Sequence, residues 1–256
     1  MLIDYSVLRP PIPLLQAAGV TAVGRYLGWD CEPGYNCIKK NLTLPEKDAL
    51  LAAGIEIWVS SEYAAKAATL GAPQGTKDAL LASRQLAALG MAAPGTAVYY
   101  AVDFDIGDYA PHLPATPANA RAKLGPVAHY FDAIHASKPN HEVDGYGGYW
   151  AISRLLDAGL IRRGWQTLAW SGGHVDTRIS LLQLIKQVLG AADVDNIPGV
   201  HVAKEEDFGQ WPRPAVPKPP PPAVITDGIL VSKTMGWTGH KMRSSDHGET
   251  WSEVNE

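Results

Sequence analysis

Two aspartates at the end of an apolar segment, Asp103 and Asp105, are the residues of this sequence best placed to do chemistry. The segment before them, TAVYYAV at 96–102, is rich in β-branched and aromatic residues, which predicts a buried strand. Residues i and i+2 of a strand face the same way, so we expect both carboxylates to point toward one site. Glycoside hydrolysis requires two such carboxyl groups, one protonated and one ionised. The alternative for Asp105 is that it caps the turn that follows, a common role of aspartate.

Polar or aromatic residues also end most of the other strands that the sequence predicts. These strands are expected at 2–5, 20–27, 55–60, 143–149, 165–170 and 180–187, the last being ambiguous between strand and helix. Helices are expected between them at 14–18, 43–53, 77–89, 116–134 (kinked at Gly125-Pro126) and 152–158. This alternation predicts parallel βαβ units, arranged either as a closed barrel or as an open doubly wound sheet.

The barrel fits the sequence better than the open sheet. No G-x-G-x-x-G motif follows the first predicted strand, which disfavours a nucleotide-binding open sheet. A barrel gathers the C-terminal ends of all its strands on one face, whereas an open sheet spreads them out. We therefore predict an α/β fold, a (β/α)8 TIM-type barrel of seven or eight strands.

Side chains at these strand ends form the candidate site. The candidates for acid–base catalysis are carboxyl groups at or just after a strand end: Asp4, Glu62, Asp103 and Asp105. Asp105 is expected to be the acid and Asp103 or Asp4 the base or electrostatic stabiliser, because crowded carboxylates raise one another's pKa. The substrate-binding candidates are side chains that suit a sugar ring or its hydroxyls: Tyr26, Tyr146, Tyr149, Trp170, Gln183 and Asp195. Packing in the core or at the rim is the alternative for each aromatic residue, and Arg25 is expected in a structural ion pair.

Composition and charge exclude several classes of function. A net charge of -4 and a pI near 6.1 give no reason to expect nucleic acid. No apolar stretch approaches the roughly 20 residues that span a bilayer, and no signal peptide is expected. The eight histidines show no ligand spacing, so neither a metal site nor a cofactor is predicted. Cys31 and Cys37 form either a small disulfide or two reduced thiols.

The sequence divides into three parts. Residues 1–211 are predicted to form the barrel, and the Pro-rich segment 212–222 a semi-rigid polyproline II linker. Residues 223–256 are too few for an independent core and contain one Asp-box pattern, S-x-D-x-G-x-T-W at 244–251. We expect this part to be a small β-hairpin module that docks on a partner, such as another virion protein.

Several motifs, in order, resemble the glycoside-hydrolase-like domain of unknown function found in actinobacterial secreted proteins and actinophage proteins. The resemblance covers about residues 1–211 and lies in these stretches: Arg25-Tyr26-Leu27, Leu42-Thr43-x-x-Glu46, Ala101-Val102-Asp103-Phe104-Asp105, Gly145-Tyr146-Gly147, Trp165-Gln166, Ala169-Trp170-Ser171-Gly172-Gly173 and Asp207-Phe208-Gly209-Gln210-Trp211. That domain is similar to the lysozyme-type barrels that cleave peptidoglycan. The resemblance implies an acidic cleft to which Asp4, Asp103, Asp105 and Asp195 correspond by position.

The resemblance implies a phage-type cell-wall glycoside hydrolase, a lysin or tail component, located in the virion or the infected host cell and acting at the cell envelope. Active lysozyme-type barrels carry Asp-x-Glu where this chain has Asp103-x-Asp105. Aspartate is one methylene shorter, and a shift of roughly 1 Å at a proton donor can cost about 100-fold in rate. The alternative is therefore a non-catalytic glycan-binding or structural virion protein. A third reading is a host enzyme that acts on a cytoplasmic sugar.

Overall fold

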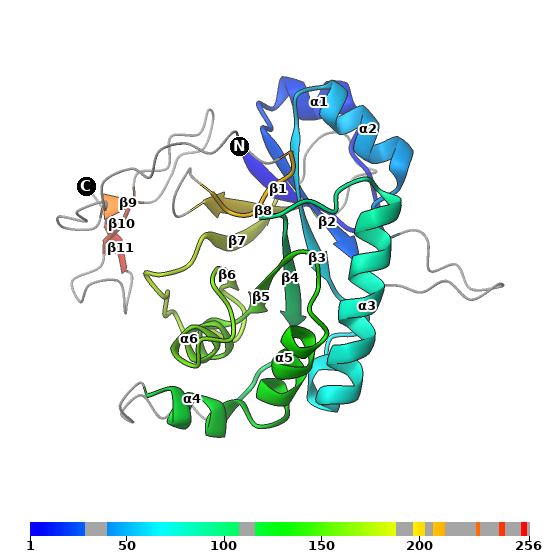
Figure 1. Cartoon of the computed structure of the whole chain (residues 1–256). Helices are drawn as coiled ribbons and strands as arrows, with labels where there is room; N and C mark the ends of the chain where they lie inside the picture. Colours follow the sequence, from blue (N-terminus) through cyan, green and yellow to red (C-terminus); the bar gives the residue numbers. More distant parts are fainter. Residues whose placement is uncertain are drawn as a thin grey trace.

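The computed structural model describes residues 1–28, 40–107, 116–187, 197–202 and 207–212, together with three short strands near the C-terminus. Seven parallel strands lie in sequence order in one curled sheet, and helices cover its outer face (Figure 1). The parallel strands are β1 (Leu2–Asp4), β2 (Ala22–Leu27), β3 (Glu56–Ser61), β4 (Ala97–Val102), β5 (Glu142–Gly147), β6 (Gly164–Thr167) and β7 (Leu181–Gln187). The helices are α1 (Ile12–Ala17), α2 (Leu44–Ala52), α3 (Ala72–Ala88), α4 (Pro117–Leu124), α5 (Pro126–Ala136) and α6 (Tyr149–Asp157), with a 3-10 helix at Ala67–Leu70. The predicted α/β class and the parallel strand order are confirmed.

An eighth strand, β8 (Ile197–Val202), distinguishes this fold from a (β/α)8 barrel. It pairs antiparallel with both β7 and β1, so it joins the two edges of the curled sheet. A parallel return needs a crossover of a dozen or more residues, and only 188–196 connect β7 to β8. Residues 168–180, all of them described, also contain no helix between β6 and β7. The complete (β/α)8 barrel of the prediction is therefore not confirmed.

The helices begin and end where particular residues require it. Thr43 caps α2, because its Oγ1 accepts a hydrogen bond from the Glu46 N–H at 3.4 Å, which is one half of the predicted capping box. The Glu46 carboxylate binds Arg25 instead of completing the other half. The single kinked helix predicted over 116–134 is instead two helices, α4 and α5. Gly125 between them has a φ of 54°, a left-handed conformation that ends α4.

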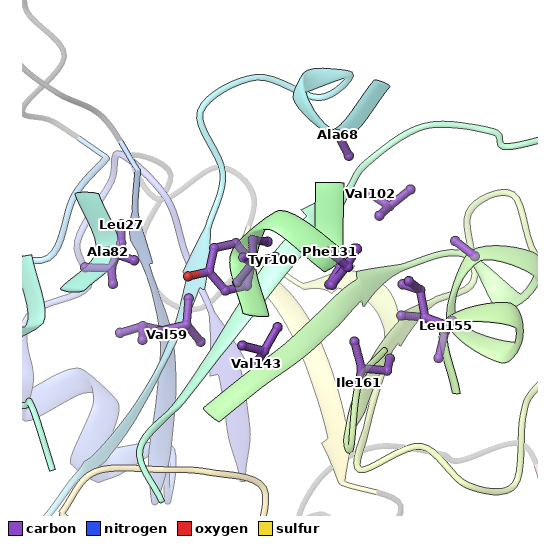
Figure 2. Close-up of a cluster of buried hydrophobic side chains, with 14 of the residues drawn as sticks. Leu27, Val59, Ala68, Ala82, Tyr100, Val102, Phe131, Val143, Leu155 and Ile161 are labelled. Atoms are coloured by element: carbon purple, nitrogen blue, oxygen red, sulfur yellow. The ribbon is translucent and has the colours of Figure 1, made fainter. Parts of the chain in front are cut away.

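The larger apolar core lies between the sheet and the helices. Strand residues such as Val59, Tyr100 and Val143 pack there with Phe131 of α5 and Leu155 of α6 (Figure 2). Burial of this surface is the main favourable term that holds the helices on the sheet.

Aromatic residues fill the inside of the curled sheet. Trp58 meets Trp165 and Phe208 edge to face at centroid separations of 5.7 Å, and Tyr99 meets Trp165 at 6.0 Å. The segment 207–211 covers the N-terminal ends of the strands: the Tyr99 hydroxyl donates to the Phe208 carbonyl at 2.7 Å.

The three short strands near the C-terminus form an antiparallel sheet of their own. They are β9 (Ile229–Leu230), β10 (Lys241–Arg243) and β11 (Ser252–Val254), with β10 in the centre. The Asp-box pattern at 244–251, Cys31, Cys37 and residues 213–222 of the predicted linker lie outside the described residues. In the described part of the chain, no helix has the length and apolar character needed to cross a membrane.

Candidate functional site

Seven polar side chains meet at the C-terminal ends of the parallel strands, and we call them the polar ring. They are contributed by β1, β2, β5, β7 and the segments next to α2, β3 and β4: Asp4, Tyr26, Lys40, Glu62, Asp103, Tyr146 and Gln183. Hydrogen bonds, an ion pair and charge interactions connect each member to its neighbours around the end of the sheet. Six of the seven are predicted site residues.

Asp4, the last residue of β1, is fully buried in this ring. Gly24 lies opposite it on β2, and a Cβ there would come within 2.7 Å of both the Asp4 Cβ and the Trp58 ring, so glycine allows this close approach. Gln183 Nε2 donates to Asp4 Oδ2 at 3.0 Å, and the Tyr26 hydroxyl donates to Oδ1 at 3.4 Å. Burial raises the pKa of Asp4 from 3.8 to about 7, although both hydrogen bonds oppose this. Asp4 therefore exchanges its proton near neutral pH.

Gln183 connects Asp4 to the far side of the ring. Its Oε1 accepts a hydrogen bond from the Tyr146 hydroxyl at 2.9 Å, and the Tyr146 ring packs on Trp165 at a centroid separation of 4.7 Å. Burial, followed by the charges of Asp103 and Asp4, raises the pKa of Tyr146 well above its usual value. The phenol therefore stays protonated and remains a hydrogen-bond donor.

Lys40, just before α2, brings a positive charge to the ring. Its Nζ lies 3.0 Å from Glu62 Oε1 and 4.1 Å from the ring centroid of Tyr26. This charge lowers the pKa of Asp4 and of Asp103, against the effect of burial. Lys40 is the ring residue that sequence reasoning missed, since no motif or periodicity relates it to the ends of β3 and β4.

Asp103 is the first residue after β4 and is partly buried. Burial raises its pKa from 3.8 to about 6, with the neighbouring charge of Glu62 as the second cause. Among the described residues, no hydrogen-bond or ion-pair partner holds its carboxylate. Asp103 is thus the ring carboxyl group best able to give a proton to a ligand at mildly acidic pH.

Asp105 is exposed and takes part in the turn after β4. Its Oδ1 accepts a hydrogen bond from the Gly107 N–H at 2.9 Å, and Gly107 has a φ of 67°. The strand ends at Val102, so the rule that residues i and i+2 share a face does not reach Asp105. The structure places this carboxylate in the capping role that the sequence allowed as its alternative.

The other predicted binding residues lie beyond the ring. Tyr149 is the first residue of α6, and its ring lies 5.2 Å from the imidazole of His174. Trp170 follows β6 in a turn and is 37% exposed. Asp195 lies outside the described residues. A substrate contact by Tyr149 or Trp170 stays a prediction.

Arg25 forms the structural ion pair that the sequence predicts. Its buried guanidinium binds the Glu46 carboxylate of α2 with Nε 2.7 Å from Oε1, and it also lies over the Tyr5 ring at 4.4 Å. It further donates to the Tyr5 carbonyl. The Arg25 charge lowers the pKa of Asp4, so this pair also affects the ring.

The ring combines groups that give and take protons near neutral pH. Asp103 titrates near pH 6 and Asp4 near pH 7, and Glu62 is an ion-paired carboxylate. Such a set can perform acid–base chemistry on a glycosidic bond or hydrogen-bond sugar hydroxyls. The described residues contain no group of three or more His, Cys, Asp or Glu side chains arranged to hold a metal ion.

Residues 14–177 match a family model described as Rv2525c-like, glycoside hydrolase-like domain. The chain belongs to this family. The match confirms the resemblance seen in the sequence motifs of this Rv2525c-like domain. A comparison with curated protein sequences gives no match.

Solved structures of similar fold include that of Rv2525c, a Tat-secreted protein of Mycobacterium tuberculosis. Its crystal structures in complex with HEPES and with L-tartrate each align at a TM-score of 0.67 and 22% identity, over 82% of this chain and 98% of Rv2525c. At that identity the likeness shows the fold alone. GHIP, a glycosyl hydrolase 25 of Streptococcus pneumoniae, aligns at a TM-score of 0.45 and 15% identity, over 80% of this chain and 86% of its own, and no conclusion rests on it.

Proposed function

We propose that this Rv2525c-like protein cleaves a glycan of the bacterial cell envelope, such as peptidoglycan, by acid–base carboxylate chemistry in the polar ring. The observation that carries the proposal is the Asp103 carboxyl group, whose pKa of about 6 suits a proton donor, beside the ion-paired carboxylate of Glu62. Glycoside hydrolysis needs one carboxyl group that keeps its proton and a second that is ionised. The glycoside hydrolase-like description of the family agrees with this chemistry.

Each carboxyl group has a different part in this proposal. Asp103 donates a proton to the leaving oxygen, in place of Asp105, which caps its turn. Glu62, oriented by Lys40, is the second carboxylate at the reacting carbon or its water. Asp4 is fully buried and acts on the ring through Gln183 and Tyr26, so it positions other groups and does not touch the substrate.

Zymography on actinobacterial cell walls tests this proposal. We expect clearing by the wild type and by Asp105→Asn, and none by Asp103→Asn, because only Asp103 supplies the proton. Asp105→Asn is the matched control, since it makes the same chemical change two residues away. Equal clearing by all three proteins contradicts the assignment.

One observation favours a second candidate function, a non-catalytic glycan-binding or structural virion protein. The second acid of the Asp-x-Asp motif, Asp105, accepts a hydrogen bond within its own turn. If the Asp105 carboxylate is occupied by its own turn and supplies no proton, the polar ring would bind sugar hydroxyls without cleaving the glycosidic bond. Retained wall binding without clearing by the wild type is the result that supports this function.

We also propose a viral setting, as a lysin or a minor tail component acting at the cell envelope from the virion or the infected cell. The support is the sequence beyond the Rv2525c-like domain: a Pro-rich spacer at 212–222 and a short segment at 223–256, which we propose to dock on another virion protein. Mass spectrometry of purified phage particles tests the tail role. Detection of the protein in the particles supports the tail role. Detection of the protein only in uninfected cells contradicts any viral role.

A further inference from the structure

Trp170 is an exposed aromatic residue in a conformation that costs energy. Its φ is 56°, a left-handed conformation that costs roughly 1 kcal/mol or more for a bulky residue. Its relative exposure of 37% leaves more than a third of the residue's surface open to solvent. An exposed indole held in a strained backbone conformation is therefore a candidate contact surface for a ligand.

Buried polar side chains hold the turn that carries this indole. Gln166 Nε2 donates to the His174 carbonyl at 2.8 Å. Ser171 Oγ donates to the Thr167 carbonyl at 2.6 Å and accepts from the Tyr149 N–H at 2.8 Å. Gln166, Thr167 and Ser171 are all buried. These hydrogen bonds fix the turn against the start of α6, so the backbone that carries the Trp170 indole is rigid.

Three more rings lie beside this turn. The Tyr149 ring lies 4.9 Å from Trp150 and 5.2 Å from His174, and Trp150 lies 5.5 Å from His174. Gly148 brings the start of α6 close to the turn, since a Cβ there would lie 3.0 Å from the Trp170 carbonyl oxygen. We call Tyr149, Trp150, Trp170 and His174 the aromatic shelf.

Two connections link the polar ring to the aromatic shelf, one from β5 to α6 and one through Thr167. Tyr146 of the ring lies near the end of β5, three residues before Tyr149 of the shelf, the first residue of α6. Thr167, at the start of the Trp170 turn, pairs in register with Gln183, whose Oε1 accepts the hydrogen bond of the Tyr146 hydroxyl. A chain-like ligand that lies over the ring at Tyr146 therefore meets the shelf next.

We propose that the aromatic shelf is a saccharide subsite, which holds a pyranose unit adjacent to the unit bound in the polar ring, with the Trp170 indole as its stacking platform. The apolar C–H face of a pyranose matches the flat face of an indole, and a rigid aromatic ring loses little conformational entropy on binding. The inference rests on the proposed function for its ligand class, a glycan, but does not require that the ring cut it.

Binding of the N-acetylglucosamine tetramer and of cellotetraose to the full chain, by calorimetry and tryptophan fluorescence, tests the shelf. Trp170→Asn removes the indole but keeps a residue type that adopts a left-handed φ readily, so we expect the fold to persist. We expect this variant to bind the better of the two sugars at least about tenfold more weakly. Trp170→Phe retains a stacking ring and should recover most of the affinity. Leu168→Ala, at an equally exposed position of the same turn, is the matched control and should bind like the wild type.

A second variant separates the shelf from the catalytic proposal. Asp103→Asn tests wall clearing, which it should lose, whereas the tetrasaccharide affinity that tests the shelf is compared between the wild type and Trp170→Asn. Sugar binding by a wild type that never clears walls overturns the enzyme proposal and leaves the shelf standing. The shelf is overturned if Trp170→Asn binds like the wild type, or if the wild type binds neither sugar at millimolar concentration.

Discussion

Replacing Asp4 by asparagine should stabilise the protein at neutral pH and not at acidic pH. Burial raises the pKa of this carboxyl group from 3.8 to about 7. Between about pH 4 and pH 7 the unfolded chain has therefore released the proton while the folded chain still binds it. In that window the wild type loses stability as pH rises, because the unfolded state binds fewer protons than the folded state. Below pH 4 the Asp4 carboxyl group is protonated in both the folded and the unfolded state, and above pH 7 it is ionised in both.

The magnitude follows from the size of the shift. A pKa shift of about three units, at roughly 1.4 kcal/mol per unit, lowers the stability of the wild type by about 4 kcal/mol above pH 7. This value is the upper limit for the stabilisation by Asp4→Asn. The neutral amide avoids this cost, and the hydrogen bonds can adapt. If the Gln183 amide turns over, its oxygen accepts from the new amide group and its nitrogen donates to the Tyr146 oxygen.

Urea unfolding followed by tryptophan fluorescence at pH 4, 6 and 8 measures the effect. The free energy of unfolding of Asp4→Asn relative to the wild type should rise by several kcal/mol from pH 4 to pH 8. Asp144 and Asp103 also titrate in this range, but they are present in both proteins and largely cancel in the difference. Asp103→Asn is the comparison variant and should show a smaller rise, because its carboxyl group is only partly buried. A difference that does not change with pH would refute burial as the cause of the Asp4 shift.

Two further predictions concern charges. Lys40→Met should raise the pKa of Asp103, because the Lys40 ammonium lowers it. A carboxyl-carbon NMR titration measures this pKa without an activity assay, and Lys66→Met, at an exposed position, is the control. An unchanged Asp103 titration in Lys40→Met contradicts the prediction. Arg163→Met leaves the buried Asp144, 3.0 Å from the guanidinium, without its charge partner and should cost about 3 to 5 kcal/mol at pH 8. Burial raises the pKa of Asp144 to about 6, so the carboxyl group is protonated at pH 5 and the cost of the substitution should be smaller there. Urea unfolding at the two pH values measures both costs. An equal cost at pH 5 and pH 8 argues against the prediction.

The parallel sheet and most of the polar ring were predictable because both depend on local patterns. Alternating strand and helix segments indicate parallel units, and parallel strands bring their C-terminal ends to one face. That reasoning alone selects Asp4, Glu62 and Asp103. The antiparallel β8 was not predictable from such patterns, since its pairing with β1 joins residues about 200 positions apart in the chain.

The differences between the expected and the observed strand ends at the site have equally physical causes. Asp105 was paired with Asp103 on the assumption that the strand continues through both, whereas it ends at Val102 and the next residues turn. Trp170 was placed at the end of a strand over 165–170, but β6 ends at Thr167, which puts the indole in a turn. The full burial of Asp4 depends on Gln183, 179 residues away, and no local pattern reports such a contact.

The central claim is that Asp103 supplies the proton for cleavage of an envelope glycan. Release of reducing ends from purified cell walls, measured from pH 4 to pH 8, tests it most directly. We expect wild-type activity to fall as pH rises through about 6, Asp105→Asn to keep this profile, and Asp103→Asn to release almost nothing at any pH. Full activity of Asp103→Asn, or loss of activity in Asp105→Asn alone, would contradict it.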